Sequence, residues 1–275
     1  MMLIDGRLRD TLPAADRGLQ FGDGVFETMA VDAGRALCLD RHLARLATGC
    51  AALGILAPEP AVLEEECARA CHGTDRGVLK VMVTRGSGGR GYAVEEGAPV
   101  TRIVARYPWP AYPVDSRKNG VAVRICQTRL GRNPRLAGIK HLNRLEQVLA
   151  RNERDPGLRD EGLMLDDRDH VIEGIMSNVF IYRNGRLSTP PLLECGVAGI
   201  VRDLVLETAQ AITASTPLVE ELGVDDLLAA DECFLTNSLI GIWPIHSIEQ
   251  QAMGVGPVAH ELQTLLRDRG AICRD

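Results

Sequence analysis

A proline-rich segment in the first half of the chain limits what the rest of the sequence can fold into. Three prolines fall within seven residues of "YPWPAYPVDSRKNG", positions 107–120 of a 275-residue chain. Proline has a fixed φ and no backbone N–H, so neither a helix nor a central strand runs easily through such a segment. We therefore expect a linker at 108–119 between a smaller N-terminal domain, 1–107, and a larger C-terminal domain, 120–275.

Helical and extended patterns alternate before this segment. In "DRHLARLATGCAALG" apolar residues recur at steps of three and four, and Gly54 suits a helix C-cap. A second helix is expected from about Pro60 to Cys71, and the runs "GVLKVMVTRG" and "VTRIVARY" are typical of strands. The first domain is therefore expected to be α/β.

The same alternation continues after the linker. "VAVRI", "GLMLDD", "NVFIY" and "RLSTP" are typical of strands, and Asn184-Gly185 between the last two predicts a type I′ hairpin. A helix is expected from about Ile200, and a terminal helix carries Leu262, Leu265 and Leu266 on one face. The second domain is also expected to be α/β.

Charge and composition exclude several classes of protein. The net charge of -6 argues against generic binding to nucleic acid or to acidic membranes. No apolar run is long enough to cross a bilayer, and "MMLIDGRLRD" lacks the basic start and apolar core of a signal peptide. We therefore expect a cytoplasmic protein with neither a membrane nor a nucleic-acid partner.

The eight cysteines do not indicate a metal site or a disulfide. They form no Cys-x-x-Cys pair, and no histidine or cysteine pair completes a zinc set at recognisable spacing. In a cytosolic chain of this size they are expected to be small, buried apolar residues.

One of only three lysines stands at a conspicuous position. Lys80, Lys118 and Lys140 are the lysines, against 28 arginines, and Lys140 lies just before "HLNRLEQVLARNE". That run predicts an amphipathic helix with an apolar stripe packed on one side, formed by Leu142, Leu145, Val148 and Leu149. Apolar surroundings favour the uncharged amine, which is the nucleophilic form of lysine. The alternative is a lysine whose head group reaches water.

A second stretch, "VIEGIMSNVFIYRNGRLSTPPLLECGVAGIVRD", brings together two further elements. Glu173 ends one extended run and Asn178 begins the next. A carboxylate against a pyridine nitrogen keeps that nitrogen protonated, so that the ring accepts electrons. Gly199 precedes a helix beginning at Ile200 and Val201, and a helix N-terminus can bind phosphate. Each feature alone also fits a solvated glutamate or an ordinary turn.

Together these residues resemble the signature of the class IV aminotransferase family of pyridoxal-phosphate enzymes. The matching positions are Glu173, Asn178, Phe180, Leu187, Thr189, Val197, Gly199, Ile200 and Arg202. The resemblance extends from "LQFGDGVFET" through "HLARL" to "FLTNSLIGIWPI". It implies a two-domain α/β enzyme of fold type IV, with pyridoxal 5'-phosphate between the domains. It also implies a homodimer with each active site near the subunit interface.

The resemblance assigns roles to particular residues of this chain. Lys140 matches the Schiff-base lysine and Glu173 the partner of the pyridine nitrogen. Arg45 matches a phosphate-binding arginine. The remaining cofactor-binding positions are Asn178, Ile200, Val201, Thr236 and Asn237.

Within the family, "RGSGGRGY" (85–92) and "RLGRNPRLAGIKHLNRLEQVLAR" (129–151) resemble the lyase members. These eliminate pyruvate from aminodeoxychorismate, a small molecule with two carboxylates, and release 4-aminobenzoate for folate synthesis. Candidate substrate contacts are Thr28, Arg90, Tyr92, Arg106 and Arg144.

Three alternatives to this interpretation arise from the same motifs. A branched-chain or D-amino acid transaminase on the same fold is the alternative reaction, and a non-catalytic phosphate-binding module is the alternative from another class. The glycine-rich run lacks the Gly-Lys-Ser/Thr ending of a P-loop, which excludes a nucleotide cradle of that kind.

Overall fold

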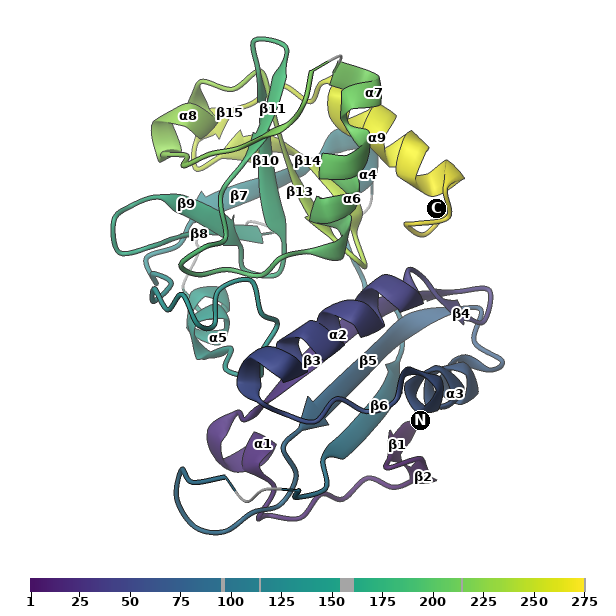
Figure 1. Ribbon diagram of the computed structural model, residues 1–275. Coiled ribbons are helices and arrows are strands. Elements are labelled where there is room, and N and C mark those ends of the chain that lie inside the picture. Colours follow the sequence, from purple (N-terminus) through teal and green to yellow (C-terminus); the bar gives the residue numbers. More distant parts are fainter. Residues whose placement is uncertain (95–96, 114, 154–160, 214, 275) are drawn as a thin grey trace. The chain divides into compact units, whose positions relative to one another are not determined.

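The computed structural model describes residues 1–275 except 95–96, 114, 154–160, 214 and 275, and it divides into two compact units (Figure 1). Unit 1 comprises Met1–Pro110, Ile139–Arg144 and Cys273–Asp275. Unit 2 comprises Ala111–Gly138 and Leu145–Ile272. The first stretch of unit 1 thus ends inside the expected linker. Ile139–Arg144, which the sequence analysis placed in the C-terminal domain, belongs instead to unit 1.

Unit 1 is built on a six-stranded antiparallel sheet in the order β2-β1-β6-β5-β3-β4. Its strands are β1 (Met2–Ile4), β2 (Arg7–Leu8), β3 (Gly24–Asp32), β4 (Arg35–Ala36), β5 (Arg76–Thr84) and β6 (Thr101–Tyr107). Its helices are α1 (Arg17–Phe21), α2 (Leu39–Leu53) and α3 (Pro60–Cys71).

Helices α2 and α3 pack on one face of this sheet, as Figure 1 shows for α2 over β3 and β5. Both helices were predicted, and α2 ends at Gly54 with the left-handed φ of 63° that suits a glycine cap. Side chains alternate along β3, so Val25 and Met29 enter the core with the helices. Phe26 and Thr28 therefore lie on the opposite face.

The segment Ile139–Arg144 adds to the edge of this sheet through backbone hydrogen bonds. The Phe26 N–H donates to the Lys140 carbonyl at 2.9 Å, and the Leu142 N–H donates to the Gly24 carbonyl at 2.9 Å. These bonds hold Lys140 in an extended segment beside the start of β3. The predicted position of Lys140 at the head of a helix is therefore wrong.

The predicted amphipathic helix is also shorter and differently packed than expected. Helix α5 spans only Leu145–Arg151, because the backbone before it is already bonded to β3. Its apolar side chains face outward, with Leu145, Val148 and Leu149 exposed by 75%, 51% and 61%. The apolar stripe therefore does not pack against the rest of its own unit in the part of the chain that the structure describes.

Unit 2 contains a nine-stranded mixed sheet in the order β12-β11-β10-β13-β14-β7-β8-β9, with β15 paired to β14. Its strands are β7 (Val121–Ile125), β8 (Glu161–Leu165), β9 (Val171–Gly174), β10 (Asn178–Arg183), β11 (Arg186–Thr189), β12 (Leu218–Val219), β13 (Glu232–Asn237), β14 (Gly241–Ile248) and β15 (Gln251–Ala252). Its other helices are α4 (Ser116–Asn119), α6 (Ile200–Thr208), α7 (Gln210–Thr213), α8 (Val224–Leu228) and α9 (Pro257–Asp268).

The local predictions for this unit are mostly confirmed. Asn184 and Gly185 have φ values of 52° and 78°, as a type I′ hairpin between β10 and β11 requires. Leu262 and Leu266 of α9 are fully buried. Inside the expected linker, however, Ser116–Asn119 form α4, which packs against β14. The prolines precede this turn of helix and do not interrupt it.

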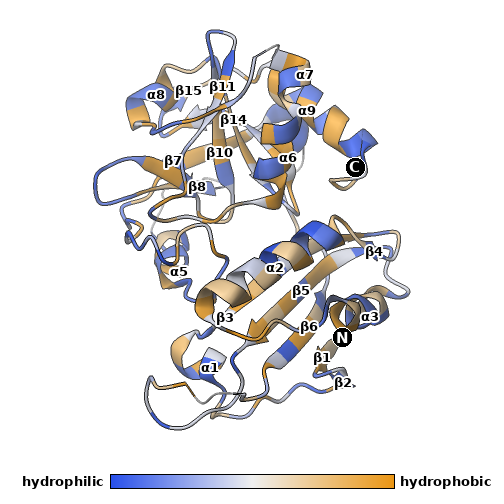
Figure 2. Cartoon of the chain, in the orientation of Figure 1, coloured by the Kyte–Doolittle hydropathy of each residue, from blue (hydrophilic) through white to orange (hydrophobic). Residues whose placement is uncertain are grey.

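Figure 2 shows apolar colouring along much of β5 and β7, and a mixture of apolar and hydrophilic colouring along the connecting loops. All eight cysteines carry free thiols, and seven of them are buried. Among the described residues no helix has the length and apolar character needed to cross a membrane. Within the same residues no group of acidic, histidine and cysteine side chains is arranged to hold a metal ion.

A buried carboxyl in unit 2 makes stability depend on pH. Burial raises the pKa of Glu161 to about 7, although it accepts hydrogen bonds from the Gly162 N–H at 3.0 Å and the Ser177 hydroxyl at 3.4 Å. Between its ordinary pKa of 4.5 and this value, the folded protein keeps a proton that the unfolded chain has lost. Stability from this group therefore falls as the pH rises through that window, by about 3 kcal/mol at most.

Replacing Glu161 by glutamine should remove this fall, because the amide keeps the shape and cannot ionise. The measurement is the melting temperature of both proteins at pH 5 and pH 7.5. We expect the variant to gain stability relative to wild type on going to pH 7.5. An equal change with pH in both proteins would contradict the prediction.

Candidate active site

The signature residues of unit 2 meet around one loop, 196–199. Glu173 lies on β9 with 4% of its surface exposed, and its Oε2 accepts a hydrogen bond from the Val197 N–H at 2.8 Å. Gly196 has a left-handed φ of 84°, and an added Cβ would lie 2.6 Å from the Leu192 side chain. The loop can pass beside the Glu173 carboxylate because this position is glycine.

Asn178 fixes the other side of the same loop. Its amide donates to the Val197 carbonyl at 2.9 Å, and a Cβ on Gly199 would lie 2.0 Å from its Oδ1. This close approach explains why the family signature has glycine before the helix. The contact gives Asn178 a structural role, and its contact with a cofactor stays a prediction.

The loop leads into the N-terminus of α6, which provides backbone donors. Gly199 is the N-cap, and no side chain in the described part of the chain caps this helix. The first-turn N–H groups of Ile200 and Val201 are therefore backbone donors of the kind that can bind an anion, and their contact with a phosphate stays a prediction. Thr236 lies opposite Asn178 on the neighbouring strand β13. Its hydroxyl is buried and has no hydrogen-bond partner among the described residues.

Other signature and phosphate positions shape the scaffold. Phe180 stacks on Phe234 with ring centroids 5.1 Å apart, and the Thr189 hydroxyl donates to the Val179 carbonyl at 2.8 Å. The Asn237 side chain accepts hydrogen bonds from the Leu239 and Ile240 N–H groups, at 2.8 and 2.9 Å. Its amide donates to the Met176 carbonyl at 3.0 Å. The Asn237 side chain therefore already forms hydrogen bonds within the β13–β14 turn, and its predicted contact with a phosphate stays a prediction.

In unit 1, Arg45 of α2 is held by a buried carboxylate. Glu27 accepts its Nε at 2.7 Å and its Nη2 at 2.5 Å, and also contacts His42 Nδ1 at 2.6 Å. Burial alone would raise the pKa of Glu27, but these two partners outweigh it and keep the pKa below its ordinary value. The Glu27 carboxylate therefore holds the Arg45 guanidinium, which is predicted to bind phosphate, in one orientation.

Lys140 and a second lysine share one aromatic ring. The Lys140 Nζ lies 4.5 Å from the ring centroid of Phe26, and the Lys80 Nζ lies 4.9 Å from the same centroid. Lys80 pairs across the strands with Thr28, a predicted substrate contact. The sequence analysis did not assign Lys80 to the site. Two features of the sequence could have indicated Lys80. Lysine is scarce in this chain, and the alternation of side chains along β5 directs Lys80 away from the core formed with α2 and α3.

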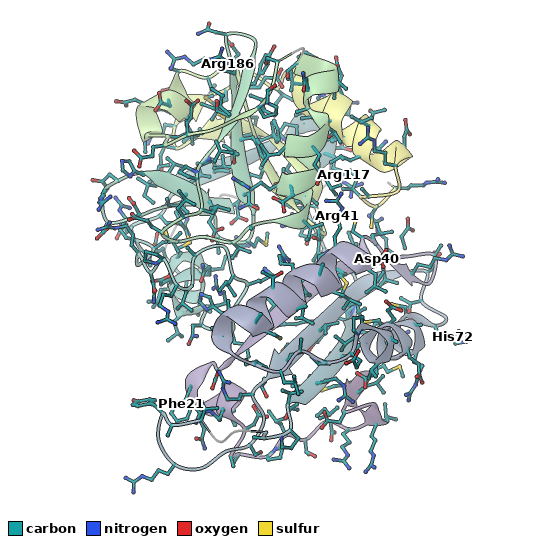
Figure 3. All side chains as sticks on the ribbon, in the orientation of Figure 1. Phe21, Asp40, Arg41, His72, Arg117 and Arg186 are labelled. Carbon is teal, nitrogen blue, oxygen red and sulfur yellow. The ribbon has the colours of Figure 1, made fainter. Side chains whose placement is uncertain are left out.

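The glycine-rich run 85–92 wraps around an arginine of α1. The Arg17 guanidinium donates to the carbonyls of Gly91 at 2.9 Å, Ala93 at 3.3 Å and Tyr92 at 3.4 Å, and pairs with Asp23 at 2.9 Å. Phe21, labelled in Figure 3, contacts the Tyr92 ring at 5.4 Å. The glycines let the backbone close around Arg17, because a Cβ on Gly88 would lie 3.0 Å from its Cδ.

The predicted substrate residues are not all brought together. Arg90 and Tyr92 are exposed on this loop. Arg106 contacts the Thr74 hydroxyl and the carbonyl of His72, which follows α3 (Figure 3), so it lies on the opposite face of the sheet from Lys80. Arg144 donates from Nε to the His141 carbonyl at 2.9 Å. Within unit 1, Thr28 is the predicted contact that shares a sheet face with Phe26.

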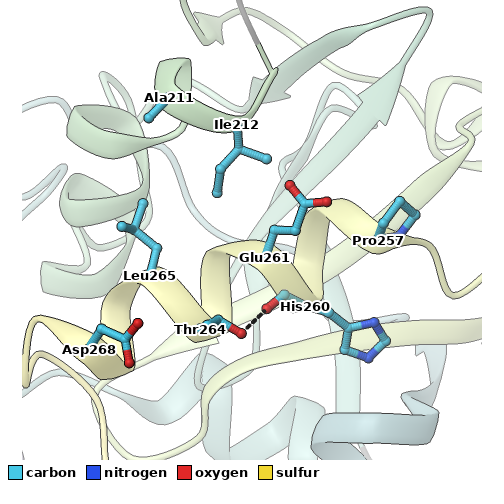
Figure 4. A pocket seen from close by; sticks show the side chains of 8 residues that line it. All are labelled: Ala211, Ile212, Pro257, His260, Glu261, Thr264, Leu265 and Asp268. Atoms are coloured by element: carbon cyan, nitrogen blue, oxygen red, sulfur yellow. Dashed lines mark hydrogen bonds between the residues drawn. The ribbon is translucent and has the colours of Figure 1, made fainter.

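A hollow of about 560 Å³ lies elsewhere, between α7 and α9 of unit 2 (Figure 4). Its lining residues are Ala211, Ile212, Pro257, His260, Glu261, Thr264, Leu265 and Asp268. No predicted site residue is among them, so we do not assign chemistry to this hollow.

The roles given to these residues rest on a resemblance to the class IV aminotransferases, and a match to that family is found. The model of the amino-transferase class IV family matches residues 24–248. The chain belongs to the class IV aminotransferase family.

Several relatives of this class IV protein match it over most of their length. Aminodeoxychorismate lyase of Vibrio harveyi is 35% identical over 250 residues, covering 90% of this chain and 91% of the relative. The crystal structure of 4-amino-4-deoxychorismate lyase from Pseudomonas aeruginosa matches with a TM-score of 0.93 and 44% identity, covering 99% of this chain and 100% of that one. D-alanine aminotransferase of Bacillus licheniformis is 32% identical, covering 97% and 96%.

The residues present fit the cofactor of the class IV family, pyridoxal 5'-phosphate. The Thr236 hydroxyl, which has no partner in the described part of the chain, and the backbone N–H groups at the start of α6 provide donors for a phosphate. Glu173 provides a carboxylate at the other end of loop 196–199. The chemistry of this donor set matches a ligand with an anion at one end and a basic ring nitrogen at the other.

Replacing Arg45 by alanine should weaken cofactor binding roughly ten- to a hundredfold, because a charge-assisted hydrogen bond is worth about 1.5–3 kcal/mol. The measurement is the Kd for pyridoxal phosphate from fluorescence titration. Pyridoxal, which lacks the phosphate, is the control ligand, and its affinity should change little. Adding Glu27→Gln to the variant removes the buried carboxylate that Arg45 would otherwise leave poorly paired. Equal losses for both ligands would remove Arg45 from the phosphate site.

Proposed function

We propose that this class IV protein is a 4-amino-4-deoxychorismate lyase that uses pyridoxal 5'-phosphate. The observation that carries the proposal is the 44% identity to the solved lyase over nearly the whole of both chains. The aminotransferase relative, at 32% sequence identity, supports membership of the family but gives weaker support to transamination as the reaction. The reaction removes pyruvate from aminodeoxychorismate and releases 4-aminobenzoate, a precursor of folate.

The family resemblance assigns residues of both units to one cofactor. When bound, the cofactor supplies a ring that accepts the electron pair left at the amine-bearing carbon of the substrate. Arg45, the α6 N-terminus and Thr236 would bind its phosphate. Glu173 would hold a proton on the ring nitrogen. These groups would hold the cofactor in place and would not themselves break a bond of the substrate.

Lys140 has two tasks in the proposed mechanism. Its amine would bind the cofactor aldehyde in the resting enzyme and, once displaced by substrate, would remove the proton from the amine-bearing carbon. Loss of pyruvate leaves the six-membered ring of the substrate free to become aromatic. This gain in stability makes the step irreversible. Cations would have to hold the two substrate carboxylates. Arg90 and Arg144 remain the predicted arginines for this, because Arg106 is directed to the α3 side of its sheet.

The competing function is transamination on the same fold. A transaminase leaves the cofactor aminated after half a reaction and needs a keto acid to continue, whereas a lyase needs none. Purified enzyme supplied with aminodeoxychorismate alone should release 4-aminobenzoate and pyruvate in equal amounts over many turnovers. Product limited to one equivalent per site, or turnover that depends on 2-oxoglutarate, would favour the transaminase.

We further propose that the enzyme is a homodimer, as the family resemblance implied. The exposed apolar face of α5 supports this, because exposed apolar clusters of this kind are typical of interfaces. Leu149→Glu should then shift sedimentation towards the monomer. Leu56→Glu, at an exposed leucine outside any helix or strand, is the matched control and should leave the dimer intact. A dimer that withstands Leu149→Glu would place the interface elsewhere. The cytoplasmic location stays a prediction.

A further inference from the structure

Lys80 and Lys140 are close enough for the charge of one to affect the other. Their amine nitrogens lie 4.9 and 4.5 Å from the same Phe26 ring centroid. Their separation therefore cannot exceed the sum of these distances, about 9.4 Å. At such a separation, and with an effective dielectric constant of about 20, two like charges shift each other's pKa by about one unit.

Several charged or titratable groups of unit 1 lie around Lys140, and Arg144 is one of them. Glu27 of β3 is neutralised by Arg45 of α2. Burial lowers the pKa of His42 on the same helix. Burial, together with the Arg144 charge, lowers the pKa of the adjacent His141 to about 4. None of these pairs involves Lys80.

Lys80 is half-buried and lies beside the Phe26 ring. Among the described residues no carboxylate forms an ion pair with Lys80. Burial lowers the pKa of Lys80, whereas its contact with the Phe26 ring favours the ammonium form. A cation without a counter-charge acts on its neighbours at longer range than one that is paired.

We propose that Lys80 is a positioning residue for Lys140: its ammonium group keeps the neighbouring Lys140 amine in the uncharged, nucleophilic form. A second cation beside a lysine is an established way of activating it as a nucleophile. This inference rests on the proposed role of Lys140 and holds for a lyase and a transaminase alike. It gives a role to Lys80, the second lysine beside the Phe26 ring.

The test is the pKa of Lys140 in the cofactor-free full-length chain. With [ε-¹³C]lysine the protein gives three Cε signals, which Lys→Met variants assign. In Lys80→Met the Lys140 pKa should rise by about one unit, the shift expected for charges about 9 Å apart. Lys80→Arg keeps the charge and should leave the Lys140 pKa near its wild-type value. Lys118→Met, which removes the exposed lysine of α4, is the matched control and should change nothing.

The outcome of this test does not depend on which reaction the enzyme catalyses. An unchanged Lys140 pKa in Lys80→Met, or a rise of the same size in Lys80→Arg, would overturn it even if the protein proved to be the lyase. If Lys80→Met does not fold, Lys80→Gln and the arginine variant give the same comparison. In the holoenzyme, the pH at which the visible cofactor band changes should rise in Lys80→Met and stay constant in Lys80→Arg.

Discussion

Replacement of Lys140 by alanine should abolish covalent attachment of the cofactor and nearly all turnover. A positioned proton-transfer group alone contributes roughly 10²–10⁴-fold, and Lys140 is assigned covalent binding as well. The structure supports a specific role, since backbone hydrogen bonds at Phe26 and Leu142 fix the position from which its amine extends. These bonds do not involve the side chain, so the fold should survive the substitution.

Borohydride reduction followed by peptide mass mapping measures the attachment directly. The wild-type protein should carry a pyridoxyl adduct on Lys140, and the alanine variant should carry none. Lys118→Ala serves as the control and should retain both the adduct and the activity. An adduct on Lys80 in the wild-type protein would transfer the covalent role to the other lysine that contacts Phe26.

Glu173→Gln should lower turnover roughly tenfold to a thousandfold while leaving the cofactor bound. A carboxylate near the ring nitrogen matters chiefly when negative charge develops on the ring, so its loss affects the transition state more than binding. The amide oxygen can still accept the hydrogen bond that Glu173 receives from Val197. The loop between β11 and α6 should therefore keep its shape.

Two measurements separate this electrostatic effect from a loss of structure. The melting temperature of Glu173→Gln should stay close to wild type, and its Kd for pyridoxal phosphate should change far less than its turnover number. Glu173→Ala, which removes both the charge and the acceptor for Val197, should in addition lose stability. Wild-type turnover in the glutamine variant would show that a different group protonates the ring.

Elements with strong local signals could be predicted from the sequence. The Gly54 cap of α2 and the Asn184-Gly185 hairpin depend on φ values that few other residues adopt, so residue type determines them locally. Helix α5 could not be predicted in the same way. Its apolar spacing extends to Leu142, but the backbone there is bonded to β3, more than a hundred residues earlier in the chain. A backbone contact between distant parts of the chain produces no periodic pattern of residues in the sequence.

The site shows a similar division. The family signature located Glu173 and the start of α6, because those residues lie close together in sequence as well as in space. It could not separate the structural role of Asn178 from a chemical one, since both require the same amide. Lys80 was missed because its position beside Phe26 depends on the pairing of β3 with β5. The side of the sheet on which Arg106 lies likewise depends on the pairing of β5 with β6, where Arg106 lies opposite the core residue Leu79.

The return of Ile139–Arg144 to unit 1 has a consequence for how this protein can be divided genetically. The chain crosses between units after Pro110, Gly138, Arg144 and Ile272, so neither unit is encoded by one continuous stretch. A fragment ending at Pro110 would leave the backbone groups of Phe26 and Gly24 without their partners around Lys140. A gene fusion that kept only the stretch before the proline-rich segment would therefore separate the sheet of unit 1 from the segment that carries Lys140, so neither unit can be expressed whole as one continuous fragment.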